Sequence, residues 1–212
     1  MKVVTLTAAA YCLFGVASSF SVVGRQQHST TTRSSTSKLF ADTSELESVL
    51  QSKYPTFNKI VKGNEELWKK LKGPEVLAFT VFIPTEDAMK NNLGEKKVIQ
   101  LLDDRNTETT NKMGMFHFVD DIVSAEKLFQ SAGVISFNGD VVPVERSVSG
   151  GFMGLLGGKE DGGSTVGGAK VTATYPVGGD DGSVGVIHEV DEFVSPSILW
   201  RYMDQLRIPG SS

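Results

Sequence analysis

Residues 78–89 constrain the fold of this chain more than any other stretch. The first half of this segment is rich in β-branched and aromatic residues, which predicts a buried strand. Pro84 then ends the strand, because proline lacks a backbone donor and keeps the residue before it extended. Thr85 is expected to cap the following helix, where Glu86 and Asp87 place negative charge at the positive end. The sequence therefore predicts a sharp strand-to-helix corner.

The length and charge of the chain narrow the classes of protein that it can be. Its 212 residues, 40% of them apolar, suffice for one domain of ordinary size with extensions. Four of the 21 basic residues and none of the 25 acidic residues precede Asp42, so residues 42–212 carry a net charge of −8. Because nucleic-acid-binding faces are basic, we expect no nucleic-acid partner.

The first 19 residues have the pattern of a signal peptide. Lys2 is followed by a short apolar run that ends in the small residues Ala17, Ser18 and Ser19. The run is too short for a membrane-spanning helix, and we expect no such helix in the mature protein. The only cysteine, Cys12, belongs to this segment, so its removal would leave no thiol for a disulfide, a nucleophile or a metal ligand.

Residues 20–42 have the composition of a transit peptide or a disordered segment. Positions 20–41 are rich in serine, threonine and basic residues and contain no acidic residue. The junction Val16-Ala17-Ser18-Ser19-Phe20 resembles the cleavage motif of bipartite plastid leaders in diatoms and related algae, where a phenylalanine follows the cut and is needed for import. The proline that usually follows soon afterwards is missing here. The resemblance implies the plastid of an alga with a secondary plastid, in the stroma or at a stromal membrane face.

A second interpretation of the leader stays open. A signal peptide followed by a disordered spacer rich in serine and threonine would have much the same composition. The protein would then be secreted or extracellular.

The rest of the chain alternates between helical and extended patterns. Residues 44–71 carry three short apolar stripes at helical spacing, and Ser44 with Glu47 is expected to form a capping box at the start of the first. Further helices are expected around residues 98–102, from a cap at Asn106-Thr107 toward Met113 and Met115, and over residues 197–212, the last with a tail. Extended segments are predicted at residues 134–137, 140–144, 170–175 and 184–194, with a hairpin turn at Asn138-Gly139.

Residues 150–168 depart from this regularity. Nine of these nineteen positions are glycine, and glycine loses more backbone entropy on ordering than any other residue. We therefore expect a flexible insertion. No Gly-x-Gly-x-x-Gly opens a helix here and no Gly-Lys-Ser/Thr follows a strand, so a nucleotide-binding loop is not predicted.

Two segments resemble the signatures of a known family. Residues 80–88, Thr-Val-Phe-Ile-Pro-Thr-Glu-Asp-Ala, resemble the first signature of the fasciclin domain, and residues 185–196 resemble the second. The Tyr-His pair found between the two signatures is Phe116-His117 here, so the phenol hydroxyl is missing. The order and spacing imply one domain over residues 43–196 with an α+β fold, a fasciclin-like β-sandwich wedge with several short α-helices. The signature residues are Thr80, Phe82, Pro84, Thr85, Ala88, His117, Val186, His188 and Asp191.

The resemblance implies an adhesion and interaction module. We expect a non-catalytic protein with protein partners, in which the nine signature residues serve the fold first and binding second. An exposed Trp200 and Tyr202 face on the last helix would be a partner site, although packing of this helix on its own domain is favoured. The apolar residues 152–156 are a further candidate for contact with a partner or, peripherally, with a membrane.

A second function from another class is a carrier of an apolar ligand such as a carotenoid or lipid, since some proteins with this domain bind carotenoids. The candidate wall residues are Met113, Met115, Phe116, Phe118 and the loop around Phe152.

The sequence offers no evident reaction centre. His117 and His188 with Asp120 or Asp191 would be a conceivable metal set, but no His-x-x-x-His or His-Glu-x-x-His spacing supports it. A strand histidine among apolar residues usually bonds the backbone. No Gly-x-Ser-x-Gly elbow and no opposed pair of carboxylates occurs either. We therefore expect no catalytic residue, no metal and no cofactor.

Overall fold

The computed structural model describes residues 43–149, 159–178 and 184–205. The predicted signal peptide and transit segment, the cluster around Phe152 and the tail after residue 205 lie outside these ranges. Within the described part of the chain, no helix has both the length and the apolar character needed to cross a membrane.

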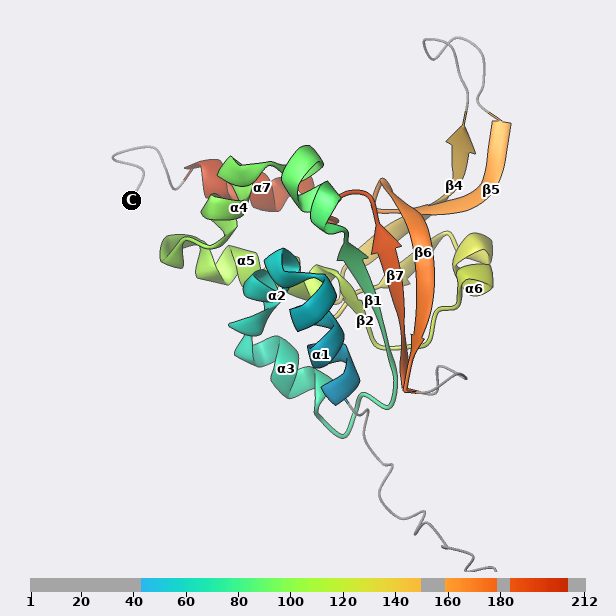
Figure 1. The fold of residues 1–212 in the computed structure, drawn as a ribbon, viewed down its shortest axis with the longest axis horizontal. Coiled ribbons are helices and arrows are strands. Elements are labelled where there is room, and N and C mark those ends of the chain that lie inside the picture. The colour runs from blue at the N-terminus through green and yellow to red at the C-terminus, as the bar shows by residue number, and fades with distance from the viewer. Residues whose placement is uncertain (1–42, 150–158, 179–183, 206–212) are drawn as a thin grey trace, which may run out of the picture. The chain divides into compact units, whose positions relative to one another are not determined.

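Helices make up one side of the domain. Figure 1 shows most of them gathered beside strands β1 and β7, with α6 beyond the strands on the other side. The bounds are α1 Ser44–Lys53, α2 Pro55–Lys62, α3 Glu65–Leu71, α4 Glu95–Leu101, α5 Thr107–Phe116, α6 Ala125–Gln130 and α7 Ser197–Gln205, with a π-helix η1 at Ala88–Leu93 and a 3-10 helix η2 at Asp104–Asn106.

The strands of the described residues form one seven-stranded sheet in the order β2-β1-β7-β6-β5-β4-β3. Strands β1 and β7 are parallel neighbours, and the other neighbouring strands of the described residues pair antiparallel. The bounds are β1 Phe79–Pro84, β2 Phe118–Val119, β3 Gly133–Ile135, β4 Val141–Ser149, β5 Lys159–Val166, β6 Ala169–Val177 and β7 Gly185–Val190.

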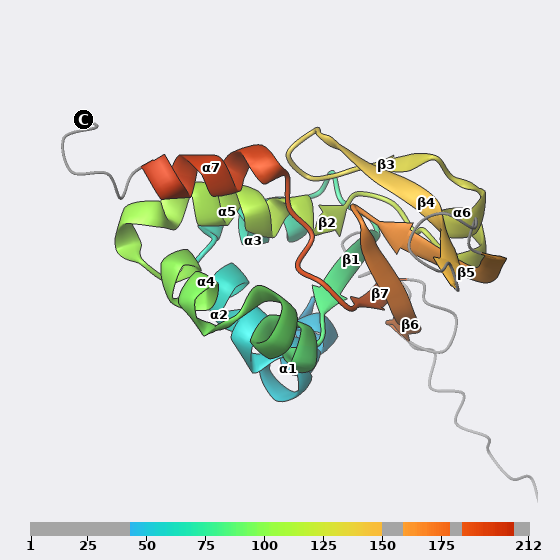
Figure 2. The ribbon, with the colours of Figure 1, turned by 90° about the horizontal axis from the view of Figure 1, so that it is seen from above.

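The two edges of this sheet touch. A single antiparallel bridge joins Val119, at the end of β2, to Ser136, just after β3. The backbone N–H of Phe137 also donates to the carbonyl of Phe118 at 2.8 Å. The sheet therefore curls until its first and last strands meet (Figure 2). The predicted α+β class is confirmed. The predicted sandwich of two separate layers is not confirmed, because the strands join in one continuous sheet.

Two groups of buried apolar residues pack against β1. Phe79, Val81 and Ile83 belong to the larger group, which contains α1, α2, α3 and α5 side chains. Phe82 belongs to the smaller group, with Val142, Val190 and other residues from β4 to β7. Alternate residues of a strand point to opposite faces, so β1 is buried on both sides and serves both groups.

The strand-to-helix corner forms as the sequence predicts. β1 ends at Pro84, and the Thr85 hydroxyl accepts a hydrogen bond from the backbone N–H of Ala88 at 3.1 Å. Glu86 has a role that the sequence did not indicate. Its carboxylate accepts from the backbone N–H of Thr56 at 2.8 Å and from the Thr56 hydroxyl at 2.7 Å, so it caps the start of α2.

Two local predictions were wrong at the start of helices. Thr43, not Ser44, occupies the N-cap of α1, and its carbonyl accepts from the N–H of Glu47 at 2.9 Å. The helix thus begins one residue too early for the Ser44 capping box. Asn106 precedes α5 but makes no side-chain capping bond there, because its amide donates to the carbonyl of Gln100 at 2.8 Å.

The prediction of a flexible insertion over residues 150–168 was wrong for its second half. Lys159–Val166 form β5, which pairs with β4 and β6. Ladder hydrogen bonds from two neighbours offset the entropy cost of the glycines. One residue separates Arg146 from Val148 on β4, whereas three separate their partners Ser164 and Glu160 on β5. The bulge therefore lies on β5, and Gly162 within it has φ of 79°, which glycine adopts without a steric penalty.

Candidate functional site

The structure brings the two signature segments side by side in the middle of the sheet. In the parallel pair of β1 and β7, Thr80 lies opposite Val186 and Phe82 lies opposite His188. The two distant segments are therefore neighbours in one sheet.

His188 is held by contacts on all sides of its ring. The ring stacks on Phe82 with centroids 5.6 Å apart and an 18° angle between planes. Its Nε2 donates to the carbonyl of Val123 at 2.7 Å. Nδ1 is therefore unprotonated and accepts a hydrogen bond from the Thr174 hydroxyl at 2.9 Å. Burial lowers the pKa of His188 and keeps the ring neutral. Both ring nitrogens are therefore occupied within the fold.

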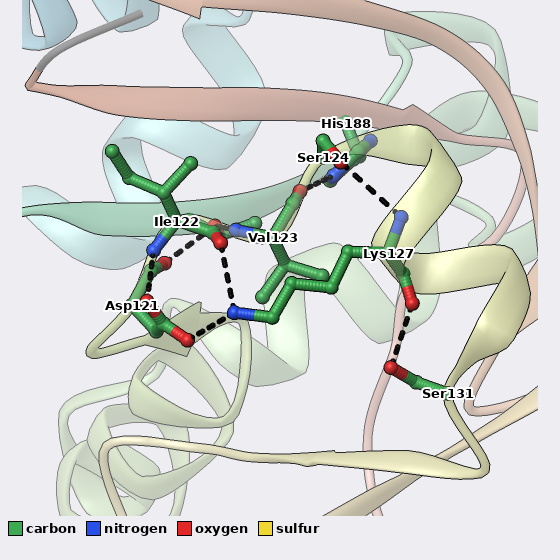
Figure 3. A network of polar contacts seen from close by, with 8 residues as sticks. Asp121, Ile122, Val123, Ser124, Lys127, Ser131 and His188 are labelled. Carbon is green, nitrogen blue, oxygen red and sulfur yellow. Dashed lines mark hydrogen bonds and ion pairs between the residues drawn. The ribbon is translucent and has the colours of Figure 1, made fainter.

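Thr80 reaches the same surface segment from the neighbouring strand. Its hydroxyl donates to the carbonyl of Asp121 at 2.7 Å and accepts from the backbone N–H of Val123 at 2.9 Å. Thr80 and His188 together hold residues 120–124 through bonds to backbone groups, and we call this segment the clamped loop. Both signatures thus contribute one polar side chain to the same loop, and Figure 3 shows the bond between His188 and Val123.

The exposed side chain of Lys127 also holds the clamped loop (Figure 3). The Nζ of Lys127 donates to the Asp121 carboxylate at 2.5 Å and to the carbonyl of Ile122 at 3.2 Å. Ser124 caps α6 by accepting from the backbone N–H of Lys127 at 3.2 Å. The hydroxyl of Ser131, after α6, donates back to the Lys127 carbonyl at 2.7 Å. The loop and the first turn of α6 therefore form one connected unit.

A pocket of about 520 Å³ opens between the clamped loop and β3. This volume lies within the usual range for ligand sites. We call it the edge pocket, and its lining residues are Lys70, Val119, Asp120, Asp121, Val123, Lys127, Ser131, Gly133, Val134, Ile135, Ser136 and Gly139.

His117 is separate from this network. Its Nδ1 donates to the carbonyl of Phe82 at 2.5 Å, and its ring lies between Phe57 and Phe193, with centroids at 4.9 and 4.5 Å. The Nε2 atom is buried without a protein partner. Burial lowers the pKa of His117 to about 4, so the ring is neutral at pH 7.

The structure does not join the two histidines into a metal site. His188 lies on the ring of Phe82 with the smaller apolar group, whereas His117 packs on Phe57 from the larger one. No group of three or more His, Cys, Asp or Glu side chains suited to a metal occurs among the residues that the structure describes. The side chain of Asp191 is engaged elsewhere, accepting from the backbone N–H of Lys170 at 2.6 Å.

Three further signature residues form the strand-to-helix corner after β1. Pro84 ends β1, Thr85 caps the turn that follows, and Ala88 is buried at the start of η1. None of the nine signature residues lines the edge pocket.

A family model of the fasciclin domain matches residues 52–196. The chain belongs to the fasciclin domain family. A solved structure, that of a FAS1 domain pair from the insect cell adhesion molecule fasciclin I, is similar to 68% of this chain with 17% sequence identity and a TM-score of 0.45. The match covers 45% of that chain, so this protein corresponds to less than half of the solved pair. No curated protein sequence matches the chain.

Apart from Asp120, which was considered above only as a conceivable metal ligand, the residues that line the edge pocket of this fasciclin domain were not singled out from the sequence. The one local signal was Ser124, which stands before an apolar helical pattern and is a good N-cap residue. The contacts of Thr80 with the clamped loop span 41 and 43 residues, and those of His188 span 65. Pairings of that length leave no periodic mark in a single sequence.

A second hollow of about 420 Å³ lies where α7 approaches the hairpin of β3 and β4, and we call it the α7 groove. Val141 and Ile198 in its lining are 64% and 45% exposed. The groove is lined by Phe116, Asp140, Val141, Pro143, Gly167, Ser195, Pro196, Ile198 and Leu199.

The aromatic residues of α7 do not form one exposed face. Trp200 packs against the larger apolar group, with its ring 6.2 Å from that of Phe193 and the Lys97 Nζ 5.0 Å above it. Tyr202 is 51% exposed. Of these two aromatic residues, only Tyr202 is exposed.

The side chains proposed as walls of a ligand cavity pack in the cores of the fasciclin domain instead. Met113, Met115 and Phe118 belong to the larger apolar group and Phe116 to the smaller one. These four residues therefore do not enclose one cavity, because the sheet separates Phe116 from the others. Phe116 alone of the four also reaches the α7 groove.

Proposed function

We propose that this fasciclin domain is a non-catalytic protein-interaction module of the adhesion type whose binding surface is the edge pocket. Fasciclin domains are typically adhesion and interaction modules, and the family match supports this class. The observation that carries the choice of surface is the clamp. Thr80 and His188 use their polar groups to fix the loop in front of which the edge pocket of about 520 Å³ opens.

The state of the histidines supports a non-catalytic role. General acid–base catalysis needs a group that can exchange protons with substrate near the working pH. His117 and His188 are fully buried, and burial lowers the pKa of both. His188 uses both ring nitrogens within the fold, and His117 lies among aromatic rings. Neither imidazole is placed to move a proton at a surface site.

The test is partner recovery with two matched variants. The tagged full-length chain is expressed in a diatom, cross-linked in intact cells and purified. Ile135 lines the edge pocket and is 65% exposed, whereas Leu77 is 66% exposed and lies outside its lining. We expect a discrete partner with the wild type and with Leu77→Asp, and its loss with Ile135→Asp. Equal recovery with all three chains, or no partner with the wild type, would contradict the proposal.

We also propose that the protein acts in the plastid, in the stroma or at a stromal membrane face. The support is the leader, whose residue Phe20 follows a signal-like segment. A fluorescent protein fused to the C-terminus of the full chain should accumulate in plastids, and Phe20→Ala should retain it outside them. Fluorescence in the medium or at the cell surface for the unchanged leader would instead favour a secreted adhesion protein.

The α7 groove favours a second candidate, the carriage of an apolar ligand such as a carotenoid or lipid. Most of its lining is apolar, with Val141, Pro143, Ile198 and Leu199 around Phe116. Protein purified from its native cells should then show a visible absorption band or contain extractable lipid, and Ile198→Asp should abolish it. A colourless, lipid-free protein that takes up no pigment on incubation would rule this function out.

A further inference from the structure

The short strand β3 presents one side of its backbone to the edge pocket. Ser136 N–H donates to the Asp140 carbonyl at 2.9 Å, and Val144 N–H donates to the Ala132 carbonyl at 3.1 Å. Hydrogen-bonded pairs alternate along an antiparallel ladder, so Val134 also bonds to β4 while Gly133 and Ile135 do not. The partner of Gly133 is Pro143, which has no N–H to give. The N–H and C=O of Gly133 and the N–H of Ile135 therefore face the pocket that both residues line, whereas the Ile135 carbonyl faces Asp120 across the bridge between Val119 and Ser136.

The rest of the domain closes this edge only in part. β2 approaches β3 at the bridge between Val119 and Ser136, where Phe137 N–H bonds to the Phe118 carbonyl and the bridge directs the Asp120 N–H at the Ile135 carbonyl. Beyond that point the chain turns into the clamped loop. Its carbonyls at Asp121 and Val123 are taken by Thr80 and His188, so they are not available to β3. The clamp thus keeps the loop apart from β3 and leaves the edge pocket between them.

The charges around the pocket suit a ligand that carries both signs. Lys127 and Asp121 neutralise each other at 2.5 Å. Lys70 donates to the Phe137 carbonyl at 2.8 Å, and within the described ranges neither Lys70 nor Asp120 forms an ion pair. One ammonium and one carboxylate in the lining are therefore without a counter-charge there. A peptide with an acidic and a basic group complements both.

We propose that the edge pocket binds a short extended peptide segment, which pairs its main chain with the N–H and C=O of Gly133 and the N–H of Ile135 and sets its charges against Lys70 and Asp120. Strand addition to a sheet edge is a general mode of peptide recognition, in which the main chain gives affinity and alternate side chains give specificity. This inference rests on the proposed interaction function and names the form of the partner segment. It requires an edge that is open but short, which protects the free protein from pairing with its own copies.

The test separates backbone pairing from side-chain contact at one position. A library of random heptapeptides displayed on phage is selected on the immobilised full chain, and the most enriched sequence is synthesised. Its affinity is measured for the wild type, Ile135→Pro and Ile135→Ala. Proline removes the N–H that faces the pocket and is tolerated in edge strands, whereas alanine keeps that N–H. We expect a loss of about tenfold or more with Ile135→Pro and about threefold or less with Ile135→Ala.

A second measurement keeps the proposal falsifiable if Ile135→Pro does not fold. Amide hydrogen exchange of the wild type, with and without the selected peptide, should show new protection at Gly133 and Ile135. Enrichment of no sequence, equal affinity for the wild type and Ile135→Pro, or protection confined to the α7 groove would overturn the proposal. If a cellular partner is lost with Ile135→Asp while selected peptides ignore Ile135→Pro, the interaction function stands and strand addition fails.

Discussion

At the scale of single residues, the signature side chains act by satisfying backbone groups rather than by presenting themselves to a ligand. Thr80 pairs with two backbone groups of the clamped loop, and His188 with a third. His117 bonds the carbonyl of Phe82, and the Phe82 ring in turn packs on His188. Each of these contacts becomes costly to break because it is buried.

Thr80→Val should destabilise the domain by about 2 kcal/mol, because it leaves the part-buried Asp121 carbonyl and the buried Val123 N–H without their partner while conserving shape. Thr172→Val is the matched control, since Thr172 is exposed on β6 and its hydroxyl bond to the Glu189 carbonyl is 3.3 Å long. Urea unfolding followed by circular dichroism gives both values. Equal midpoints for the two variants would show that the Thr80 contacts contribute nothing particular.

His117 should make stability depend on pH below neutrality. Burial lowers the pKa of His117 to about 4, whereas the unfolded chain binds this proton near pH 6.5. The contribution is therefore complete above pH 6.5 and is lost as the pH falls from 6.5 toward 4, by up to about 3 kcal/mol. His117→Phe should flatten the dependence in this window relative to the wild type, in unfolding curves at pH 7, 6 and 5. Parallel curves for the two proteins would contradict the buried neutral imidazole.

At the scale of elements, the structure shows which parts of the fold can be read from local sequence. The end of β1 at Pro84, the Thr85 cap and the hairpin turn at Gly139, with φ of 84°, follow from the residues themselves. Strand β5 does not, because its glycine-rich sequence becomes ordered only through its neighbours β4 and β6. The edge pocket was missed for the same reason. Its walls are placed by long-range contacts of Thr80 and His188, whose residue types alone do not name a partner.

Glu86 should matter more than its neighbour Asp87, although both are acidic and share one turn. Glu86 caps the start of α2 through Thr56, whereas Asp87 is exposed. Glu86→Ala should lower the free energy of unfolding by about 1 kcal/mol, the usual worth of an N-cap, and Asp87→Ala by much less. Thermal unfolding of both variants decides the matter, and equal losses would mean that only the charge of the turn counts.

At the scale of the whole domain, β1 and β7 connect two apolar groups into one cooperative unit. β1 supplies Phe79 to the larger group and Phe82 to the smaller one, while β7 supplies Ile187 and Val190 in the same way. Neither group can be exposed without disturbing the parallel pair. The fasciclin signatures therefore describe the part of the domain on which both halves depend.

Unfolding should accordingly be a single transition seen by different probes. Trp68 and Trp200 both pack on the larger group, so their fluorescence reports on it, whereas circular dichroism reports on helices and strands throughout. The two signals should give the same urea midpoint for the full chain. A fluorescence change that precedes the circular dichroism change would mean that the helical side unfolds independently.

The central claim is that the signature strands hold the clamped loop open in front of β3. Amide hydrogen exchange of the full chain, compared between the wild type and Thr80→Val, tests it most directly. The account predicts that exchange at Val123, whose N–H is bonded by Thr80 at 2.9 Å, accelerates by a larger factor than exchange at the amides of β7. The same factor at Val123 and along β7 would report only a general loss of stability and would contradict the clamp.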